Sequence, residues 1–386
     1  MTNSNPTRRT VLKAVAASAG AVALPRALFA QSGDTLRIGA CVPITGPFAM
    51  SGQQYHYSLQ MAQDDINKAG GIKGRKLEIV FEDVQASNSV AVNAYIKLVR
   101  DLNPPFVFLS SYSTQNLATE PEVRKSQIPC MYAGGAEAVH ERGNPWMFRI
   151  RPADSIQATA MAQYALKDMG KKKPGILFIQ NDFGQGAASN AERIFKDAGI
   201  CVAGSEAYGV NDNNMSAQLL KLKNAGADVI LEIGYPKDGA LIMKQLKSLG
   251  IGVPMIISSG LVVPAAISLL TPEETADIVG VTDAFLDPSR GPKVADYVER
   301  FQKRFNLRPD PYGSCFYDGA MILKSAIEAA GTDKAKLRDY LKGVKNHEGV
   351  TQVFNTDAHG NMVHSVAVVK FKAGTTELAY VKTITV

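Results

Sequence analysis

The chain alternates between strand-like and helix-like runs, and this alternation most restricts the folds that it can adopt. A strand-like run at residues 36–42 is followed by a helix-like run at 53–68 that ends at Gly70-Gly71. Glycine ends helices because it adopts the left-handed backbone conformation at low cost. The further runs before residue 150 are strands at 76–81, 106–109 and 128–133 and helices at 89–101 and 121–125. Strands that alternate with helices predict a parallel sheet covered on both faces.

The same alternation starts again after Arg149-Ile150-Arg151-Pro152. This second series has strands at 175–180, 202–207, 229–233 and 255–258 and helices at 185–197, 216–225, 237–249 and 262–270. Two similar series predict two similar lobes. The C-terminal part of the chain departs from this alternation, with helices at 292–305 and 318–330, then strands at 362–371 and 378–386. We expect the tail to return to the first lobe, so that several crossovers form a hinge.

The first 30 residues are typical of a bacterial export signal. Arg8 and Arg9 precede a short apolar run at 14–24, and Ala30 supplies a small residue at the expected cleavage point. Adjacent arginines favour the twin-arginine export route. The alternative is a membrane anchor, but the apolar run is far shorter than the roughly 20 residues of a spanning helix. We therefore expect a periplasmic protein.

Most of the net charge belongs to this leader. The formal charge of +6 becomes +2 when residues 1–30 are removed, because they hold four basic residues and no acid. Neither nucleic acid nor an anionic membrane surface is expected as a partner. The remaining 356 residues, 386 less 30, suffice for two domain cores. The widely spaced cysteines, which show no redox or zinc motif, are expected to be buried free thiols: Cys41, Cys130, Cys201 and Cys315.

No catalytic or cofactor pattern stands out in the chain. Gly184-x-Gly186-x-x-Ser189 lacks the third glycine of a dinucleotide fingerprint. The chain contains neither a Walker loop nor a Gly-x-Ser-x-Gly elbow. The five histidines are scattered without metal-ligand spacing. We therefore expect no cofactor, no metal and no enzymatic activity.

Several segments resemble the periplasmic binding proteins of branched-chain amino acid uptake systems. The most specific is Ile66-Asn67-Lys68-Ala69-Gly70-Gly71-Ile72-Lys73-Gly74, which stops a helix and turns the chain into the next strand. The other matching segments are Ile38-Gly39 to Gly46-Pro47, Asp182-Phe183-Gly184-Gln185-Gly186, Ala227-Asp228-Val229 and Gly234-Tyr235. The resemblance covers essentially the whole chain after the leader.

The resemblance implies an α/β fold of the type I periplasmic binding protein class, a Venus flytrap. Each of its two lobes is a mainly parallel sheet flanked by helices, and three hinge crossovers join them. Lobe 1 would comprise residues 31–151 with 284–348, and lobe 2 residues 152–283 with 349–386. A ligand would be held in the cleft between the lobes.

Two loops of the first lobe are suited to bind a carboxylate. Ligands collect beyond the C-terminal ends of parallel strands, where helix N-termini offer free N–H groups. The loop at 110–114 adds hydroxyl donors, although the alternative role of its serines is helix capping. In the loop at 133–136, glycines allow a close approach to the backbone. By resemblance to the family, the expected carboxylate contacts are Ser111 and Ala136, with Gly134 and Gly135 beside them.

The second lobe is expected to supply aromatic cover. Phe183 and Tyr235 fall where the family carries aromatic residues over the ligand, although either ring is also consistent with ordinary wall packing. Tyr112 stands where close relatives have a small residue, and it would make the pocket narrower and more aromatic. The resemblance therefore implies a pocket with apolar, ring-lined walls.

One departure from the family concerns the ligand's ammonium. Branched-chain binders carry an acidic residue in the loop after the fourth strand of lobe 2, where this chain has Ser258-Ser259-Gly260. Burying an unpaired ammonium is costly, so an amino-acid ligand needs another carboxylate. Glu232, Asp182 and Asp238 are candidates, with Glu232 first because it interrupts a buried-looking strand. Ser259 and Glu232 therefore join the candidate site, although an ion pair or strand-end solvation would equally explain Glu232.

The expected function is that of a solute receptor of an ABC importer. It would capture a small carboxylate ligand, a branched-chain or other hydrophobic amino acid, as a monomer that closes on its hinge. An inner-membrane ABC permease with its ATPase would be its partner. The alternatives are a receptor for aromatic or aliphatic carboxylates that lack an ammonium, and a sensory ligand-binding module.

Overall fold

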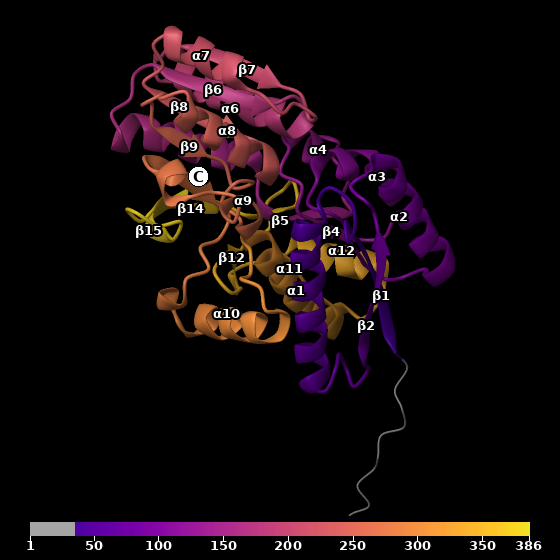
Figure 1. Ribbon diagram of the computed structural model, residues 1–386. Helices are drawn as coiled ribbons and strands as arrows, with labels where there is room; N and C mark the ends of the chain where they lie inside the picture. The colour runs from indigo at the N-terminus through magenta and orange to yellow at the C-terminus, as the bar shows by residue number, and fades with distance from the viewer. Residues whose placement is uncertain (1–34) are drawn as a thin grey trace, which may run out of the picture. The chain divides into compact units, whose positions relative to one another are not determined.

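Two main sheets organise residues 35–386, the part of the chain that the computed structural model describes (Figure 1). The first sheet has six strands in the order β13-β5-β4-β3-β1-β2, all in parallel pairs. Their bounds are β1 (Leu36–Val42), β2 (Leu77–Asp83), β3 (Val107–Phe108), β4 (Cys130–Tyr132), β5 (Met147–Pro152) and β13 (Asn361–Val363). Central strands are buried on both faces, which explains the nearly continuous apolar run of β1.

The second sheet has seven strands in the order β15-β14-β10-β9-β8-β6-β7. The strands are β6 (Pro174–Ile179), β7 (Gly204–Tyr208), β8 (Val229–Ile233), β9 (Met255–Ile257), β10 (Ile278–Thr282), β14 (Ser365–Phe371) and β15 (Leu378–Thr385). Strands β6 to β10 pair in parallel, whereas β14 runs antiparallel to both β10 and β15. A separate two-stranded ribbon joins β11 (His347–Glu348) and β12 (Val353–Phe354).

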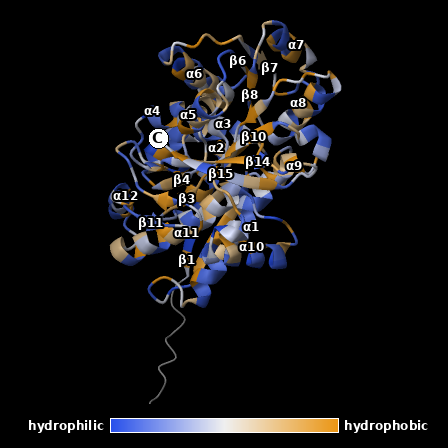
Figure 2. Ribbon diagram, turned by 90° about the vertical axis from the view of Figure 1, so that its left-hand side faces the viewer, coloured by the Kyte–Doolittle hydropathy of each residue, from blue (hydrophilic) through white to orange (hydrophobic). Residues whose placement is uncertain are grey.

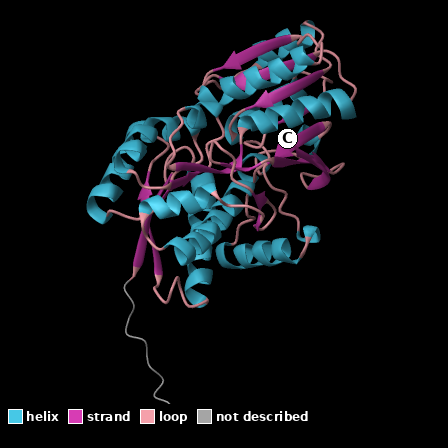
Figure 3. Cartoon of the chain, turned by 180° about the vertical axis from the view of Figure 1, so that it is seen from behind, coloured by secondary structure: helices cyan, strands magenta, loops and turns pink. Residues whose placement is uncertain are grey.

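Helices cover the strands on both sides (Figure 3). In the first half of the chain these are α1 (Ala49–Lys68), α2 (Asn88–Leu102), α3 (Ser113–Ser126), α4 (Glu137–Glu141), α5 (Asp154–Gln163) and α6 (Asp182–Asp197). The later ones are α7 (Ser216–Asn224), α8 (Pro236–Ser248), α9 (Pro264–Ile267), α10 (Pro292–Phe305), α11 (Pro311–Ala330) and α12 (Lys334–Lys342). Hydrophobic residues gather along the strands and hydrophilic ones on the outer helices (Figure 2). This layered arrangement buries hydrophobic cores against both sheets.

The expected alternation is confirmed, with differences at element ends. Residues 36–42, 229–233 and 292–305 have the bounds that were expected. The short helix expected at 121–125 is the end of α3, which runs from Ser113 and contains Pro121. The single strand expected at 362–371 is wrong, because it splits at His364 into β13 and β14, which belong to different sheets.

The tail returns to the first lobe, as its helical pattern predicted. Helix α11 packs on α1, and its apolar face joins the core of the first sheet. The chain passes between the sheets after β5, after β10 and after β13. The lobe limits as a whole stay a prediction, but the boundary expected at 348/349 is too early. Phe354, Met362 and Val363 pack in the first core, so the third passage falls near residue 364.

Three further points concern the leader, the cysteines and the membrane. The signal peptide expected at 1–30 lies outside the described residues. All four cysteines are free; Cys41, Cys130 and Cys315 are buried as expected, but Cys201 is exposed. From residue 35 onward, no helix combines the length and the apolar character needed to cross a membrane.

Candidate functional site

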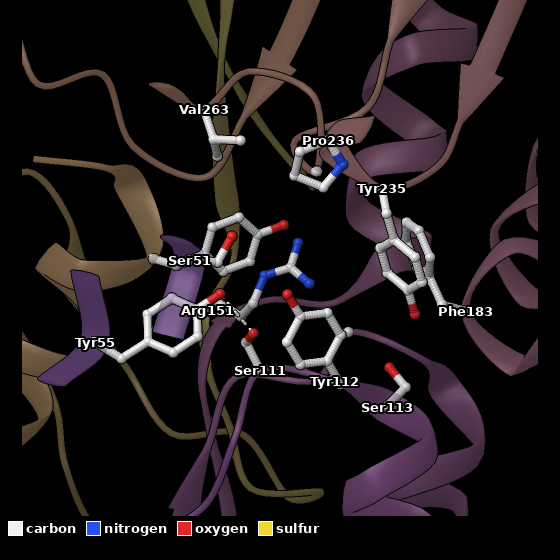
Figure 4. A pocket seen from close by; sticks show the side chains of 13 residues that line it. Ser51, Tyr55, Ser111, Tyr112, Ser113, Arg151, Phe183, Tyr235, Pro236 and Val263 are labelled. Atoms are coloured by element: carbon white, nitrogen blue, oxygen red, sulfur yellow. Dashed lines mark hydrogen bonds between the residues drawn. The ribbon is translucent and has the colours of Figure 1, made fainter. Parts of the chain in front are cut away.

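A small cavity lies among loops from both sheets (Figure 4). Its volume is about 30 Å³. The residues around it are Ser51, Tyr55, Ser111, Tyr112, Ser113, Gly135, Arg151, Phe183, Tyr235, Pro236, Gly260, Val263 and Tyr312. Hydroxyl groups, aromatic rings and one guanidinium dominate this lining, to which the described residues contribute no carboxylate. Most of its members lie at or just beyond the C-terminal ends of β3, β4, β5, β6, β8 and β9, where a parallel sheet collects ligands.

The first-sheet wall consists of hydroxyls at the start of α3. Ser111 Oγ donates to Tyr55 Oη at 2.7 Å, as Figure 4 shows. Ser113 Oγ accepts the backbone N–H of Ala136 at 3.0 Å. These bonds fix the two loops to each other and to α1. The wall therefore presents oriented hydroxyls at a helix N-terminus, an arrangement suited to an anionic group.

The second-sheet wall is aromatic. Tyr235 links β8 to α8, and its hydroxyl accepts from Asn181 Nδ2 at 3.2 Å. Phe183, in the first turn of α6, stacks on Tyr235 with ring centroids 5.5 Å apart. Both rings face the cavity in Figure 4. This wall offers apolar surface and one anchored phenol.

Aromatic rings from the two walls meet inside the cleft. Phe48, in the loop after β1, stacks on Tyr112 with centroids 4.1 Å apart and planes inclined by 9°. Tyr235 meets Phe48 at 5.2 Å and Tyr112 at 5.5 Å, in both cases edge to face. These rings account for the small volume. A cavity that holds benzene is about 150 Å³, so a ligand needs the rings or the lobes to move apart.

Arg151 is the one charged residue that the described part of the chain places in the lining, and it was not among the residues predicted for the site. It is 2 % exposed. Its Nε and Nη2 donate to the carboxylate of Asp283 at 2.5 and 3.0 Å, and Nη1 donates to Asp154 at 3.2 Å. Burial alone would lower the pKa of Arg151, but the carboxylates, Asp283 foremost, raise it well above its usual value. The guanidinium is therefore charged and held in place.

Asp154 lies beside Gly135 of the cavity wall and has an unused oxygen. The carboxylate is buried, and its Oδ2 has no hydrogen-bond partner within residues 35–386. Burial raises the pKa of Asp154 to about 6, against the opposing charges of Arg151 and Arg149. A side chain at Gly135 would collide with Asp154 Oδ1 and Arg151 Nη1. Glycine at 135 therefore keeps the approach to this carboxylate open.

The structure brings most of the sequence-predicted residues together. Ser111, Tyr112, Gly135, Phe183 and Tyr235 are in the lining. The other predicted residues lie outside it.

Three of those lie just behind the wall. Ser259 Oγ accepts from Arg151 Nη2 at 3.1 Å and lies 2.9 Å from Tyr312 Oη. Gly134 packs against Asn116 and Ser113, and the N–H of Ala136 is taken by Ser113. They support the lining rather than contribute to it.

The acidic residues that were predicted to pair with the ligand's ammonium lie outside the cavity lining. Glu232 is fully buried in β8, 3.3 Å from Tyr208 Oη, and burial raises its pKa well above the usual value. Asp182 is exposed, and Asp238 lies in the first turn of α8; neither lines the cavity. Glu232 is a core carboxylate in this conformation, and its burial disfavours the charged form.

Among the lining residues that were not predicted, Arg151 had a recognisable signal in the sequence. In β5, two arginines alternate with apolar residues, and a charge at the C-terminal end of a buried strand lies where ligands collect. Tyr312 gave no such signal, because tyrosines in amphipathic helices usually pack in the core. Among residues 35–386, no group of three or more His, Cys, Asp or Glu residues could hold a metal ion.

Comparison with known families covers nearly the whole described chain. The family model described as periplasmic binding protein matches residues 35–376. Leu/Ile/Val-binding protein homolog 7 of Brucella abortus is 26 % identical over 352 residues, which span 86 % of each chain.

Solved structures agree in fold. The substrate-binding protein LivJ of Streptococcus pneumoniae, in complex with isoleucine, is 22 % identical with a TM-score of 0.81, covering 90 % of this chain and 100 % of that one. A solute-binding protein from Rhodopseudomonas palustris, in complex with 3,4-dihydroxybenzoic acid, is 20 % identical with a TM-score of 0.81. That match covers 91 % of this chain and 98 % of the other. These two likenesses establish the fold alone.

Proposed function

Because the chain belongs to the periplasmic binding protein family, we propose that it is the substrate-binding receptor of an ABC importer and captures a small hydrophobic α-amino acid. Relatives named Leu/Ile/Val-binding proteins and a neighbour that holds isoleucine support this ligand class. Capture would bridge the two lobes and favour the closed arrangement, which the permease with its ATPase would then recognise. The leader supports delivery to the periplasm by the twin-arginine route.

The observation that carries this proposal is the buried carboxylate of Asp154, which lies against Gly135 and has no hydrogen-bond partner for its Oδ2 within residues 35–386. An α-ammonium needs an anionic partner when it leaves water. The Ser258-Ser259-Gly260 loop offers none. Asp154 Oδ2 supplies the missing charge from another element, α5, and its present environment leaves it unsatisfied.

The remaining parts of an amino acid also find complementary groups. Ser111 and Ser113 at the N-terminus of α3, with the guanidinium of Arg151, would hold the carboxylate. The rings of Phe183 and Tyr235 would cover an apolar side chain. Each chemical part of the ligand therefore meets a different element of the site.

A second ligand class is a carboxylate without an ammonium, such as an aromatic acid. The cavity lining favours it, because no carboxylate of the described residues belongs to that lining. So does the high proportion of aromatic rings there. The neighbour that holds 3,4-dihydroxybenzoic acid supports the same class.

A thermal-shift panel separates the two classes. Ligands that bind the native state raise its melting temperature. At a ligand concentration one hundred times Kd, the free energy of unfolding increases by about 2.7 kcal/mol. We expect L-leucine, L-isoleucine or L-phenylalanine to raise it, and 4-methylpentanoate, which is leucine without the ammonium, to have little effect. Benzoate that stabilises while the amino acids do not would establish the second class. If no probe acts, the proposed receptor function for small carboxylates fails.

The variant Asp154→Asn directly tests whether the Asp154 carboxylate pairs with the ligand's ammonium. Asparagine has nearly the same shape as aspartate but no charge, so the affinity for amino acids should fall at least tenfold. Asp238→Asn is the matched control, because Asp238 also has a pKa raised to about 6 by burial but, unlike Asp154, is not among the groups that lie against Gly135. Equal losses in both variants would argue against Asp154 as the ammonium partner.

A further inference from the structure

Asp283 lies where the three segments that join the two sheets come together. It directly follows β10, and both its carboxylate oxygens accept from Arg151, at the end of β5. Its backbone carbonyl accepts from the side chain of Gln352, which precedes the third passage. Gln352 Oε1 in turn accepts from Ser365 Oγ, at the start of β14, at 3.1 Å. One buried aspartate therefore ties together all three joining segments.

Arg151 connects this junction to the cavity. The same guanidinium that holds Asp283 donates to Ser259 Oγ and lies 5.0 Å from the ring of Tyr312. Ser259 follows β9 of the second sheet, whereas Tyr312 belongs to α11, which packs on the first. The hydroxyls of Ser259 and Tyr312 are 2.9 Å apart. Arg151 therefore contacts the hinge and both walls.

From this geometry we propose that Arg151 is a positioning residue that couples the ligand cavity to the hinge through Asp283. Any change in the joining segments moves Asp283, and the paired hydrogen bonds pass that movement to the guanidinium in the cavity wall. The inference deepens the proposed function and rests on it, because the coupling serves ligand capture. It assigns to Arg151 the role of setting how far the lobes close.

The pair suits this role because both charges are buried and, among residues 35–386, Arg151 is the one ion-pair partner of Asp283. The Arg151 and Asp283 side chains are 3 % and 0 % exposed. Removing one charge of a buried pair leaves the other uncompensated, which is costly. The two parallel hydrogen bonds also fix direction, since the guanidinium fork matches the carboxylate only in one plane. Lysine keeps the charge but cannot reproduce this geometry.

Gln157 adds a second link between the same groups. Its Nε2 donates to Asp283 Oδ1 at 2.8 Å, and its Oε1 accepts the backbone N–H of Ser259 at 3.3 Å. Gln157 belongs to α5, which begins directly after the first joining segment. The orientation of Asp283 is therefore specified from two sides, as a coupling element requires.

The test measures lobe closure by energy transfer between two dyes. Cys201, on the second lobe, is the exposed native thiol, and Lys125→Cys places a second one at the end of α3, where Lys125 is 79 % exposed. The variants are Asp283→Asn, Arg151→Met and Arg151→Lys. Asp287→Asn is the matched control, because it removes the same charge four residues later, where Asp287 only caps a short turn.

We expect the label distance to shift in Asp283→Asn and Arg151→Met before any ligand is added, and to stay unchanged in Asp287→Asn. With L-leucine or 4-hydroxybenzoate as probe, these two variants should need at least tenfold more probe to close. The double variant should lose no more than the single ones, because the two residues act as a unit. Arg151→Lys should recover melting temperature but not closure, which a merely structural role would not produce.

Two outcomes separate this inference from the proposed function. If neither probe closes the wild-type protein but the variants shift the ligand-free distance, the proposed ligand classes fail and the coupling stands. If the wild type closes and Asp283→Asn closes at the same probe concentration, with the same ligand-free distance, the coupling is overturned. A lower melting temperature with unchanged label distances would also overturn it.

Discussion

Tyr112 and Tyr235 meet edge to face, with ring centroids 5.5 Å apart and planes inclined by 70°. Tyr112 follows β3 of the first sheet, and Tyr235 follows β8 of the second. Their contact is thus a direct link between the two lobes, and it takes up space that a ligand needs. Binding must separate the two rings, either by side-chain movement or by movement of the lobes.

Replacing Tyr112 by serine should therefore enlarge the cavity and improve binding. The ring is 6 % exposed, so its loss should lower the free energy of unfolding by about 3 kcal/mol. Affinity for L-phenylalanine should nevertheless rise about tenfold, because no ring has to be moved. Calorimetric titration measures this. Tyr112→Phe keeps the ring and should behave like the wild type; loss of binding in Tyr112→Ser would instead make the ring part of the binding surface.

Gly135→Ala should abolish binding. The added methyl would collide with Asp154 Oδ1 and Arg151 Nη1, so both charged groups would have to shift. Gly186→Ala is the matched control, since Gly186 lies inside α6 with open space around the added atom. Alanine there should stabilise the protein by about 0.5–1 kcal/mol and leave titration curves unchanged. Undiminished binding in Gly135→Ala would show that the ligand does not approach this side.

The fold was predictable because it depends on patterns that repeat over many residues. Successive strand-like runs, most of them followed by turn residues or a helix-like segment, left few alternatives to two parallel sheets. The strand at 362–371 was misread because both halves are apolar, and only tertiary pairing reveals that His364 separates two sheets. The third boundary was misplaced for the same reason.

The candidate site was only partly predictable. Residues that follow a strand directly, such as Ser111 and Tyr235, are placed by the topology of the sheet. The roles of Arg151 and Asp154 could not be predicted in this way. They depend on contacts with Asp283 and Gly135, which are distant from them in sequence. Glu232 was chosen as a buried acid on a strand, but burial alone cannot reveal which face of the sheet a side chain occupies. Its neighbour Tyr208 comes from β7.

Binding of an amino acid should depend on pH through Asp154. Its pKa is raised to about 6, chiefly by burial, while Arg151 and Arg149 oppose and Glu137 and Asp283 reinforce the shift. An ammonium needs the ionised carboxylate, so affinity for L-leucine should fall by up to about tenfold per pH unit below 6. An aromatic acid without an ammonium should not lose affinity in this way. Titrations at pH 5, 6 and 7 check this, and Asp154→Asn should remove the dependence.

Asp318→Asn should reduce the pH dependence of stability. Asp318, on α11, accepts the backbone N–H of Val350 at 2.9 and 3.0 Å, and burial raises its pKa to about 8. Because the folded pKa lies above the unfolded value of about 3.9, its stabilising contribution is fully present below pH 3.9 and is lost as the pH rises through 8.

Between pH 5 and 9 the wild type should therefore lose up to roughly 4 kcal/mol of unfolding free energy from this group alone. The asparagine in Asp318→Asn would keep the acceptor for Val350 without a titrating proton, so the loss should be smaller by that amount. Urea unfolding at pH 5, 7 and 9 measures it. Asp333→Asn, at the exposed N-cap of α12, is the control and should leave the slope unchanged. An identical slope in Asp318→Asn would mean that Asp318 is already ionised in the folded protein at pH 5.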